Sequence, residues 1–245
     1  GGLFFAKAGQ NMLDAGQPVL AILGFIGWVV GITVIFSSLL LFVPEKTITA
    51  AASPDAHTLG TVLRQQKFRA LFWQMFCGTF GGLLIIGNLK PIGLSIELTA
   101  EAATLAVMLF AVANAAGRVL WGLWYDRLGR IVLTADMLLL SAGALLMGLV
   151  QNQTAFYIAT VMVAFAFGGC FVLYAARVAD FFGTDRISDI YPFVFLGYGI
   201  AGLTGAPVGG WLLATSGSPL LPGLTVILIA AFGTVSIIRL NRQAD

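Results

Sequence analysis

One arginine inside an apolar stretch is the residue of this sequence best suited to bind a small molecule. Arg118 lies in NAAGRVLWG, residues 114–122, and it is the only charged residue between positions 102 and 125. Its guanidinium offers a planar fork of hydrogen-bond donors that matches a carboxylate. Arg118 therefore predicts a binding site for a small organic anion. Two structural roles stay open: the side chain could extend to the polar end of its helix, or it could form an ion pair with Asp136.

A compact group of glycines and charged residues follows this arginine. It consists of Gly122, Asp126, Arg127, Gly129 and Arg130. Glycines allow helix ends to approach closely. Asp126 could accept hydrogen bonds from Arg127 or Arg130, or lie at the positive N-terminus of a neighbouring helix. The group could therefore act as a latch that opens and closes as two helix bundles rock, although a plain, positively charged turn would explain the same residues.

Four further residues are candidates for a ligand pathway. Asp136 is the only carboxylate inside an apolar stretch, and it could carry a proton or form an ion pair. Trp73, Tyr174 and Tyr198 could line a ligand cavity, because aromatic walls are common in ligand sites. No ligand cluster surrounds the two cysteines or the single histidine, so we expect no metal and no cofactor. No apolar stretch carries a pair of groups suited to catalysis, so we expect no enzyme.

The elements that carry these residues are expected to cross a membrane. Of the 245 residues, 59% are hydrophobic and only 10% are charged, whereas soluble proteins have about a quarter of their residues charged. The net charge of +2 is too small and too scattered to predict nucleic-acid binding. Stretches of about 20 apolar residues predict seven membrane-spanning helices. They lie at 18–43, 70–89, 102–125, 131–150, 155–176 and, on either side of a break at 215–223, within 190–238.

The distribution of basic residues predicts the orientation of these helices. Alternate threading places residues 44–69, 126–130, 177–189 and the tail after Ile238 on one side, with ten of the 13 lysines and arginines. Because basic residues stay on the cytoplasmic side, the C-terminus is predicted to be cytoplasmic. We expect an integral, multi-pass protein of a bacterial inner membrane.

The glycine and charge group resembles a loop signature of major facilitator superfamily transporters, G-x-x-x-D-R-x-G-R. In that family the signature occurs between helices two and three and again between helices eight and nine. The layout of one span, a long polar segment and six spans is similar to the region around the second copy. The resemblance implies an all-α membrane protein with the major facilitator fold: one six-helix bundle, helices seven to twelve, plus helix six. It also implies that an N-terminal half, with helices one to five, is missing.

The same resemblance implies a division of the chain. Residues 1–17 would form the end of helix five and an outer loop, 18–43 helix six, 44–69 the central cytoplasmic loop, 70–240 the C-terminal six-helix bundle, and 241–245 a cytoplasmic tail. In this family two such bundles surround a substrate site near the middle of the membrane.

The surroundings of Arg118 resemble the eighth helix of monocarboxylate carriers and of the oxalate/formate antiporter group, in which the arginine contacts the substrate carboxylate. Residues 179–212 are similar to their helices ten and eleven. The resemblance implies a secondary active transporter, working by alternating access, that moves a mono- or dicarboxylate by exchange or by proton symport. Its partners would be this organic anion and the lipid bilayer.

Two departures from these families bear on coupling and on the substrate. Asn114 occupies the position where mammalian monocarboxylate carriers have an aspartate. This weakens a proton-symport interpretation and leaves Asn114 as a candidate binding residue. Oxalate exchangers have a lysine in helix eleven, whereas residues 190–213 contain neither lysine nor arginine, which favours a monocarboxylate. The alternative is a major facilitator transporter for a neutral or cationic small molecule, of the drug-efflux type, with Arg118 structural.

Overall fold

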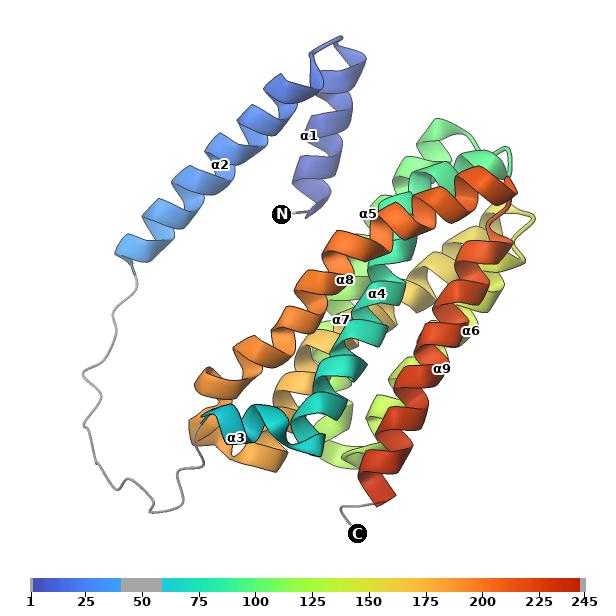
Figure 1. Cartoon of the computed structure of the whole chain (residues 1–245). Helices are drawn as coiled ribbons and strands as arrows, with labels where there is room; N and C mark the ends of the chain where they lie inside the picture. Colours follow the sequence, from blue (N-terminus) through green and yellow to red (C-terminus); the bar gives the residue numbers. More distant parts are fainter. Residues whose placement is uncertain (1, 41–58, 243–245) are drawn as a thin grey trace. The chain divides into compact units, whose positions relative to one another are not determined.

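The computed structural model describes residues 2–40 and 59–242, and every regular element within them is a helix (Figure 1). Seven of the described helices are long and apolar enough to cross a membrane. The predicted number of spans and the predicted all-α membrane fold are therefore confirmed. Most of the predicted polar segment 44–69, and most of the predicted tail 241–245, lie outside the described residues.

The chain divides into two compact units, Gly1–Ala56 and His57–Asp245. Within the first unit the described elements are α1 (Gly2–Asp14) and α2 (Val19–Leu39). The α2 helix has no charged residue, and its apolar side chains are exposed around almost its whole circumference. A helix that is apolar all round is typical of a membrane span.

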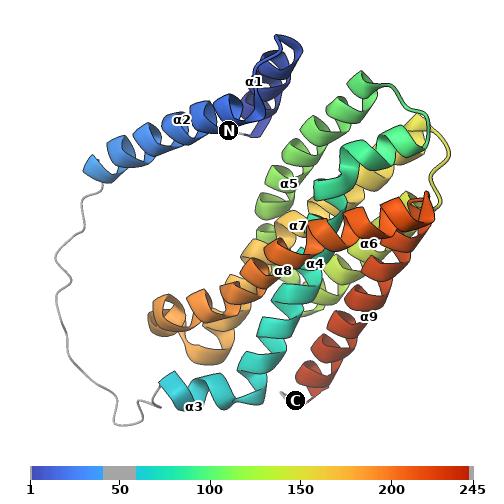
Figure 2. The ribbon, with the colours of Figure 1, turned by 45° about the horizontal axis from the view of Figure 1, so that its top comes forward.

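Within the second unit the described residues form six long helices, arranged as a bundle, with one short α-helix before them (Figures 1 and 2). Its elements are α3 (Leu59–Arg64), α4 (Gln66–Ser95), α5 (Ala100–Leu128), α6 (Ile131–Gly148), α7 (Gln153–Phe182), η1 (Thr184–Arg186), α8 (Ile187–Ser216) and α9 (Leu220–Arg242). Both views show α4 beside α8 and α9, and both neighbours contact it along the bundle.

Successive long helices run in opposite directions, so their connections alternate between the two ends of the bundle (Figure 1). The turns after α5 and α7 lie at the same end as α3 and the last turn of α9. We call it the basic end, because most described basic side chains of the bundle gather there. They are Arg64, Lys67, Arg69, Arg127, Arg130, Arg177, Arg186 and Arg239.

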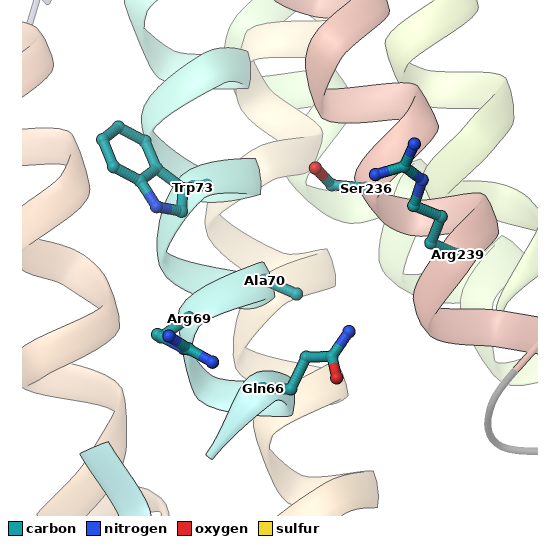
Figure 3. A pocket seen from close by; sticks show the side chains of 6 residues that line it. All are labelled: Gln66, Arg69, Ala70, Trp73, Ser236 and Arg239. Carbon is teal, nitrogen blue, oxygen red and sulfur yellow. The ribbon is translucent and has the colours of Figure 1, made fainter. Parts of the chain in front are cut away.

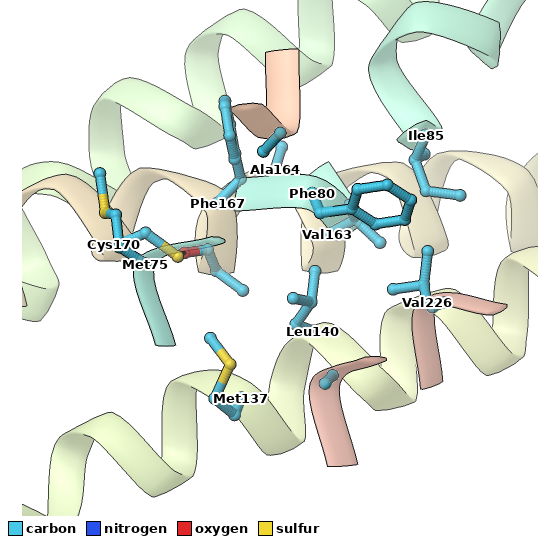
Figure 4. Close-up of a cluster of buried hydrophobic side chains, with 14 of the residues drawn as sticks. Met75, Phe80, Ile85, Met137, Leu140, Val163, Ala164, Phe167, Cys170 and Val226 are labelled. Atoms are coloured by element: carbon cyan, nitrogen blue, oxygen red, sulfur yellow. Dashed lines mark hydrogen bonds between the residues drawn. The ribbon is translucent and has the colours of Figure 1, made fainter. Parts of the chain in front are cut away.

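Large apolar side chains from α4, α6, α7 and α9 interlock in the centre of the bundle (Figure 4). Lipid is as apolar as these side chains, so helices in a membrane are held together by close packing rather than by removal from water. Glycines provide the room for that packing. A Cβ on Gly82 would overlap the Phe167 ring, and a Cβ on Gly81 would lie 2.8 Å from Cγ1 of Val226.

Candidate functional site

Arg118 lies on an exposed face of α5, inside the membrane-spanning length of the helix. At about 1.5 Å per residue it is roughly 15 Å from the helix end at Leu128, which is farther than an arginine side chain extends. Its guanidinium carbon Cζ lies 4.3 Å from the centroid of the Phe171 ring on α7. This cation–π contact orients the guanidinium and leaves its N–H groups able to donate to a ligand.

The Phe171 ring belongs to an aromatic cluster that α7 and α8 form together. The other members, Tyr191, Phe195 and Tyr198, recur at helical spacing and share one face of α8. The Tyr198 ring centroid lies 5.2 Å from that of Phe171 and 5.0 Å from that of Phe195. The Tyr191 hydroxyl donates to the carbonyl oxygen of Phe171 at 3.0 Å. Tyr198, one of the predicted site residues, therefore lies one ring away from the arginine.

Close contact between the backbones of α5 and α7 brings the arginine to this cluster. Gly117 faces the carbonyl oxygen of Phe165, and Gly168 faces the carbonyl oxygen of Asn114, each so closely that a Cβ would overlap that oxygen. The indole Nε1 of Trp121 donates to the same Phe165 carbonyl at 3.1 Å. Small residues at such an interface are what allow two membrane helices to touch along their backbones.

Asn114 lies one helical turn before Arg118 and is half-buried against α7. Its side-chain oxygen Oδ1 is buried and has no hydrogen-bond partner among the described residues. Residues four apart on a helix are neighbours on its surface, so the Asn114 amide and the Arg118 guanidinium can contact one small ligand together.

Two other aromatic residues that the sequence suggested for this site lie elsewhere. Tyr174 is only 1% exposed, and its hydroxyl packs close to Gly78 of α4, because this side of α7 faces the bundle core. Trp73 is 47% exposed on α4 and lines a separate cavity together with Arg239 of α9 (Figure 3). Neither ring belongs to the aromatic cluster around Phe171.

Asp136 on α6 is completely buried, and the ion pair with Arg118, which the sequence left open, is not formed among the described residues. Its Oδ2 accepts a hydrogen bond from the Cys170 thiol at 3.7 Å, whereas Oδ1 has no partner there. The two side chains do not pair because they point to different places. The carboxylate of Asp136 points from α6 into the bundle core, while the guanidinium of Arg118 faces an aromatic ring on the exposed side.

The glycines of the glycine and charge group shape the turn between α5 and α6. Gly129 follows α5 with φ 62° and ψ −144°, and its N–H donates to the carbonyl oxygen of Tyr125 at 2.8 Å. Gly122 packs against α7, where a Cβ would lie 3.2 Å from Cγ1 of Val172. One glycine therefore allows a backbone conformation, and the other allows a close helix contact.

Replacing Gly129 with alanine is expected to lower the free energy of unfolding by about 1–3 kcal/mol, because this region of φ and ψ is costly for a residue with a Cβ. Thermal unfolding of the purified protein in detergent measures the change. Gly202→Ala is the matched control, since Gly202 lies inside α8 with open space around it. Equal shifts in the two variants would contradict the role of the turn.

The structure shows a contact between α5 and α7 at the basic end that the sequence did not suggest. Asp126 and Arg127 are exposed, and no ion pair joins these two side chains within residues 59–242. Instead the Tyr125 hydroxyl donates to the carboxylate of Asp180 on α7.

An arginine completes this link between α5 and α7. Arg177 Nη1 lies 3.4 Å from Oδ2 of Asp180, and its Cζ lies 4.0 Å from the Phe181 ring centroid. The sequence prediction missed the link because it ended this span at residue 176. A helix continued to Phe182 would have placed Arg177 and Asp180 on one face.

The variant Tyr125→Phe is expected to lower the free energy of unfolding by about 1 kcal/mol. This is less than is usual for a hydrogen bond to a charged group, because the Asp180 side chain is 47% exposed. A double-mutant cycle with Asp180→Ala, which removes the acceptor, separates this contact from others. The free energy of unfolding should fall less in the double variant than the sum of its losses in the two single variants. Strictly additive losses would show that the two side chains do not interact.

Comparison with known proteins agrees with the membrane bundle. Residues 71–244 match the family described as Major Facilitator Superfamily. The chain is 30% identical over 161 residues, 64% of its length and 40% of the relative, to the uncharacterized MFS-type transporter YhjX of Escherichia coli (strain K12). It is 26% identical over 230 residues, 89% of its length and 54% of the relative, to the oxalate:formate antiporter of Oxalobacter formigenes. The chain thus spans about half the length of these curated relatives.

Proposed function

This chain belongs to the Major Facilitator Superfamily, a family of membrane transporters and not of enzymes, and we propose that it carries out secondary active transport of a small organic anion, a mono- or dicarboxylate. Arg118, a cation within the membrane-spanning length of α5, carries the proposal. The similarity to an oxalate:formate antiporter supports the same substrate class.

An uncompensated charge inside a membrane is costly, by about 2.5–3.5 kcal/mol on insertion scales. Against the Arg118 guanidinium the described residues place an aromatic ring, and they place no carboxylate within ion-pair distance. A bound anion supplies the missing negative charge. The planar fork of N–H donors suits a carboxylate, which can accept two parallel hydrogen bonds.

The aromatic cluster favours a small, flat substrate with one carboxylate. Phe171 and Tyr198 form an apolar wall beside the guanidinium, and Asn114 offers an amide one turn away. Between Ile190 and Leu213, α8 carries no lysine or arginine that could hold a second carboxylate. A monocarboxylate is therefore the favoured substrate of the arginine and its aromatic wall.

We assign α4 to α9 to helices seven to twelve of the family fold and α2 to helix six, with the basic end on the cytoplasmic side of a bacterial inner membrane. The gathering of arginines and lysines at that end supports this orientation. Transport would then follow from the rocking of two helix bundles about a site near the middle of the membrane.

The test of this function is transport by the intact protein in liposomes. Vesicles loaded with unlabelled lactate, pyruvate, formate or oxalate are given the labelled acid outside, and its uptake by exchange is measured. Uptake of one of these acids, blocked by the unlabelled acid and not by a hydrophobic cation such as tetraphenylphosphonium, is the expected result. If only neutral or cationic compounds were carried, the anion proposal would be overturned and Arg118 would be structural.

The variant Asp136→Asn tests how transport is coupled. We propose exchange rather than proton symport, because Asp136 lies in the core away from Arg118 and because Asn114 replaces a carboxylate beside the arginine. The variant is therefore expected to exchange the carried acid at nearly the rate of the unaltered protein. Loss of uptake driven by a pH gradient, with exchange retained, would instead identify Asp136 as the coupling group.

A further inference from the structure

A cavity lies at the basic end of the bundle, between α4 and α9 (Figure 3). Its volume is about 460 Å³, and its lining residues are Gln66, Arg69, Ala70 and Trp73 of α4 with Ser236 and Arg239 of α9. Neither helix contributes to the aromatic cluster beside Arg118, which α7 and α8 form. The cavity is therefore distinct from the proposed substrate site.

The charge of this cavity is positive and is not balanced by the described residues. Arg69 and Arg239 both line it, and no acidic residue does. Neither guanidinium has an ion pair or cation–π contact within residues 59–242, whereas nearby Arg177 is paired with Asp180 and Lys67 lies over the Phe181 ring. Two guanidinium groups that share one cavity without a counter-charge suit an anion such as a phosphate group.

The surface of α9 that leads to the cavity is apolar and exposed. Leu224, Leu228, Phe232 and Val235 are between 40% and 72% exposed. They recur at helical spacing, so they form one stripe, and Arg239 follows one turn beyond Val235 along it. On α4, half-exposed Trp73 lies one turn from Arg69, and tryptophan is enriched where a membrane meets water.

We propose that this cavity binds the phosphate group of an anionic phospholipid from the surrounding bilayer. Arg69 and Arg239 donate to the phosphate oxygens. The Ser236 hydroxyl and the Gln66 amide, which line the same cavity, donate to the rest of the headgroup. The acyl chain follows the apolar stripe of α9. This assignment does not depend on the transported substrate, because it uses other helices and another anion.

A membrane lipid is favoured over a soluble phosphate because charge and apolar surface are continuous along α9. A free phosphate would use the two arginines alone and leave the stripe of Leu224, Leu228, Phe232 and Val235 without a role. A phospholipid uses both, since its headgroup and chain have the same order as Arg239 and the stripe. Basic pockets between membrane helices near the cytoplasmic surface are known to hold anionic headgroups.

Native mass spectrometry of the intact protein in detergent tests the proposal, with phosphatidylglycerol and phosphatidylcholine titrated separately. Phosphatidylglycerol is expected to bind more tightly. The double variant Arg69→Gln/Arg239→Gln is expected to weaken that binding by about 10- to 30-fold, as for the loss of two basic residues near an anionic lipid. Arg239→Lys should keep part of the affinity, since it keeps the charge without the fork of donors.

Arg64→Gln is the charge-matched control, because Arg64 is exposed at the same end on α3 and does not line the cavity. Equal loss of phosphatidylglycerol binding in this control and in Arg239→Gln would overturn the proposal, and so would unchanged binding in the double variant. Inorganic phosphate that competes with the lipid as well as a short-chain phosphatidylglycerol does would assign the cavity to a soluble anion instead. Elution of each variant as a single species in size-exclusion chromatography shows that it is folded.

Discussion

Exchange of the carried acid is expected to fall by about 30-fold or more when Arg118 is replaced by glutamine, since removing one partner of a desolvated charge pair costs at least about 2 kcal/mol. Glutamine keeps much of the length and polarity of the side chain and removes the positive charge. In the described structure that charge meets the Phe171 ring and no carboxylate. The bound substrate would therefore lose its counter-charge, while the fold would lose only one cation–π contact.

The conservative variant Arg118→Lys separates charge from geometry. A lysine keeps the charge but cannot donate two parallel hydrogen bonds to one carboxylate, so its exchange rate should lie between those of the unaltered protein and Arg118→Gln. Initial rates over a range of acid concentrations, in liposomes with equal amounts of protein, measure the effect. Arg64→Gln removes the same charge from an exposed position on α3 and should leave exchange unchanged. Full activity in Arg118→Gln would make the arginine structural.

The largest loss of stability is expected from Gly168→Val. A Cβ at this position would overlap the carbonyl oxygen of Asn114 on the neighbouring α5, and a backbone cannot move aside as a flexible side chain can. Overpacking a core commonly costs about 1–3 kcal/mol, and here two membrane helices would have to separate along their length. We expect little or no folded protein from Gly168→Val, and a clearly lowered unfolding temperature for the smaller change Gly168→Ala.

Size-exclusion chromatography of detergent extracts, followed by thermal unfolding, measures both variants. Gly199→Ala is the control, because Gly199 lies in α8 with no atom near its missing side chain. It should elute and unfold like the unaltered protein. If Gly168→Ala behaved in the same way, α5 and α7 would not pack through their backbones. Arg118 would then have no reason to lie beside the aromatic cluster.

The described helices follow the apolar runs of the sequence, but their ends differ. The sequence predicted one span from residue 70, whereas α4 begins at Gln66; it ended another at residue 176, whereas α7 continues to Phe182. The length of an apolar run matches the thickness of the hydrocarbon layer of the membrane. The helix itself can continue into the polar layer, because its backbone hydrogen bonds are made within the helix. Arg177 and Asp180, which form the α7 side of the link with Tyr125, lie in one of these extensions, and the link was missed for that reason.

The residues of the candidate site were also predicted from the sequence only in part. Arg118 stands out in the sequence because a lone charge in an apolar run is rare, and Tyr198 lies near it in the structure. Tyr174 and Trp73 were equally plausible as wall residues from their chemistry. One packs in the core and the other lines the cavity between α4 and α9. Residue type does not reveal which side of a helix faces its neighbours when every side is apolar.

The sequence by itself determined the all-α membrane class, the seven spans and the family, and it singled out Arg118 as a candidate binding residue. These depend on composition and on residues close together in the chain. Only the tertiary structure decided which side chains and backbone groups these residues contact. Glycines on α5 and α7 bring two helix backbones into contact and place Arg118 over Phe171, while Asp136 is turned into the core towards Cys170. A helix that is apolar all round has no apolar stripe that would predict which side faces its neighbours. Close packing between segments distant in the chain therefore determines which residues are in contact.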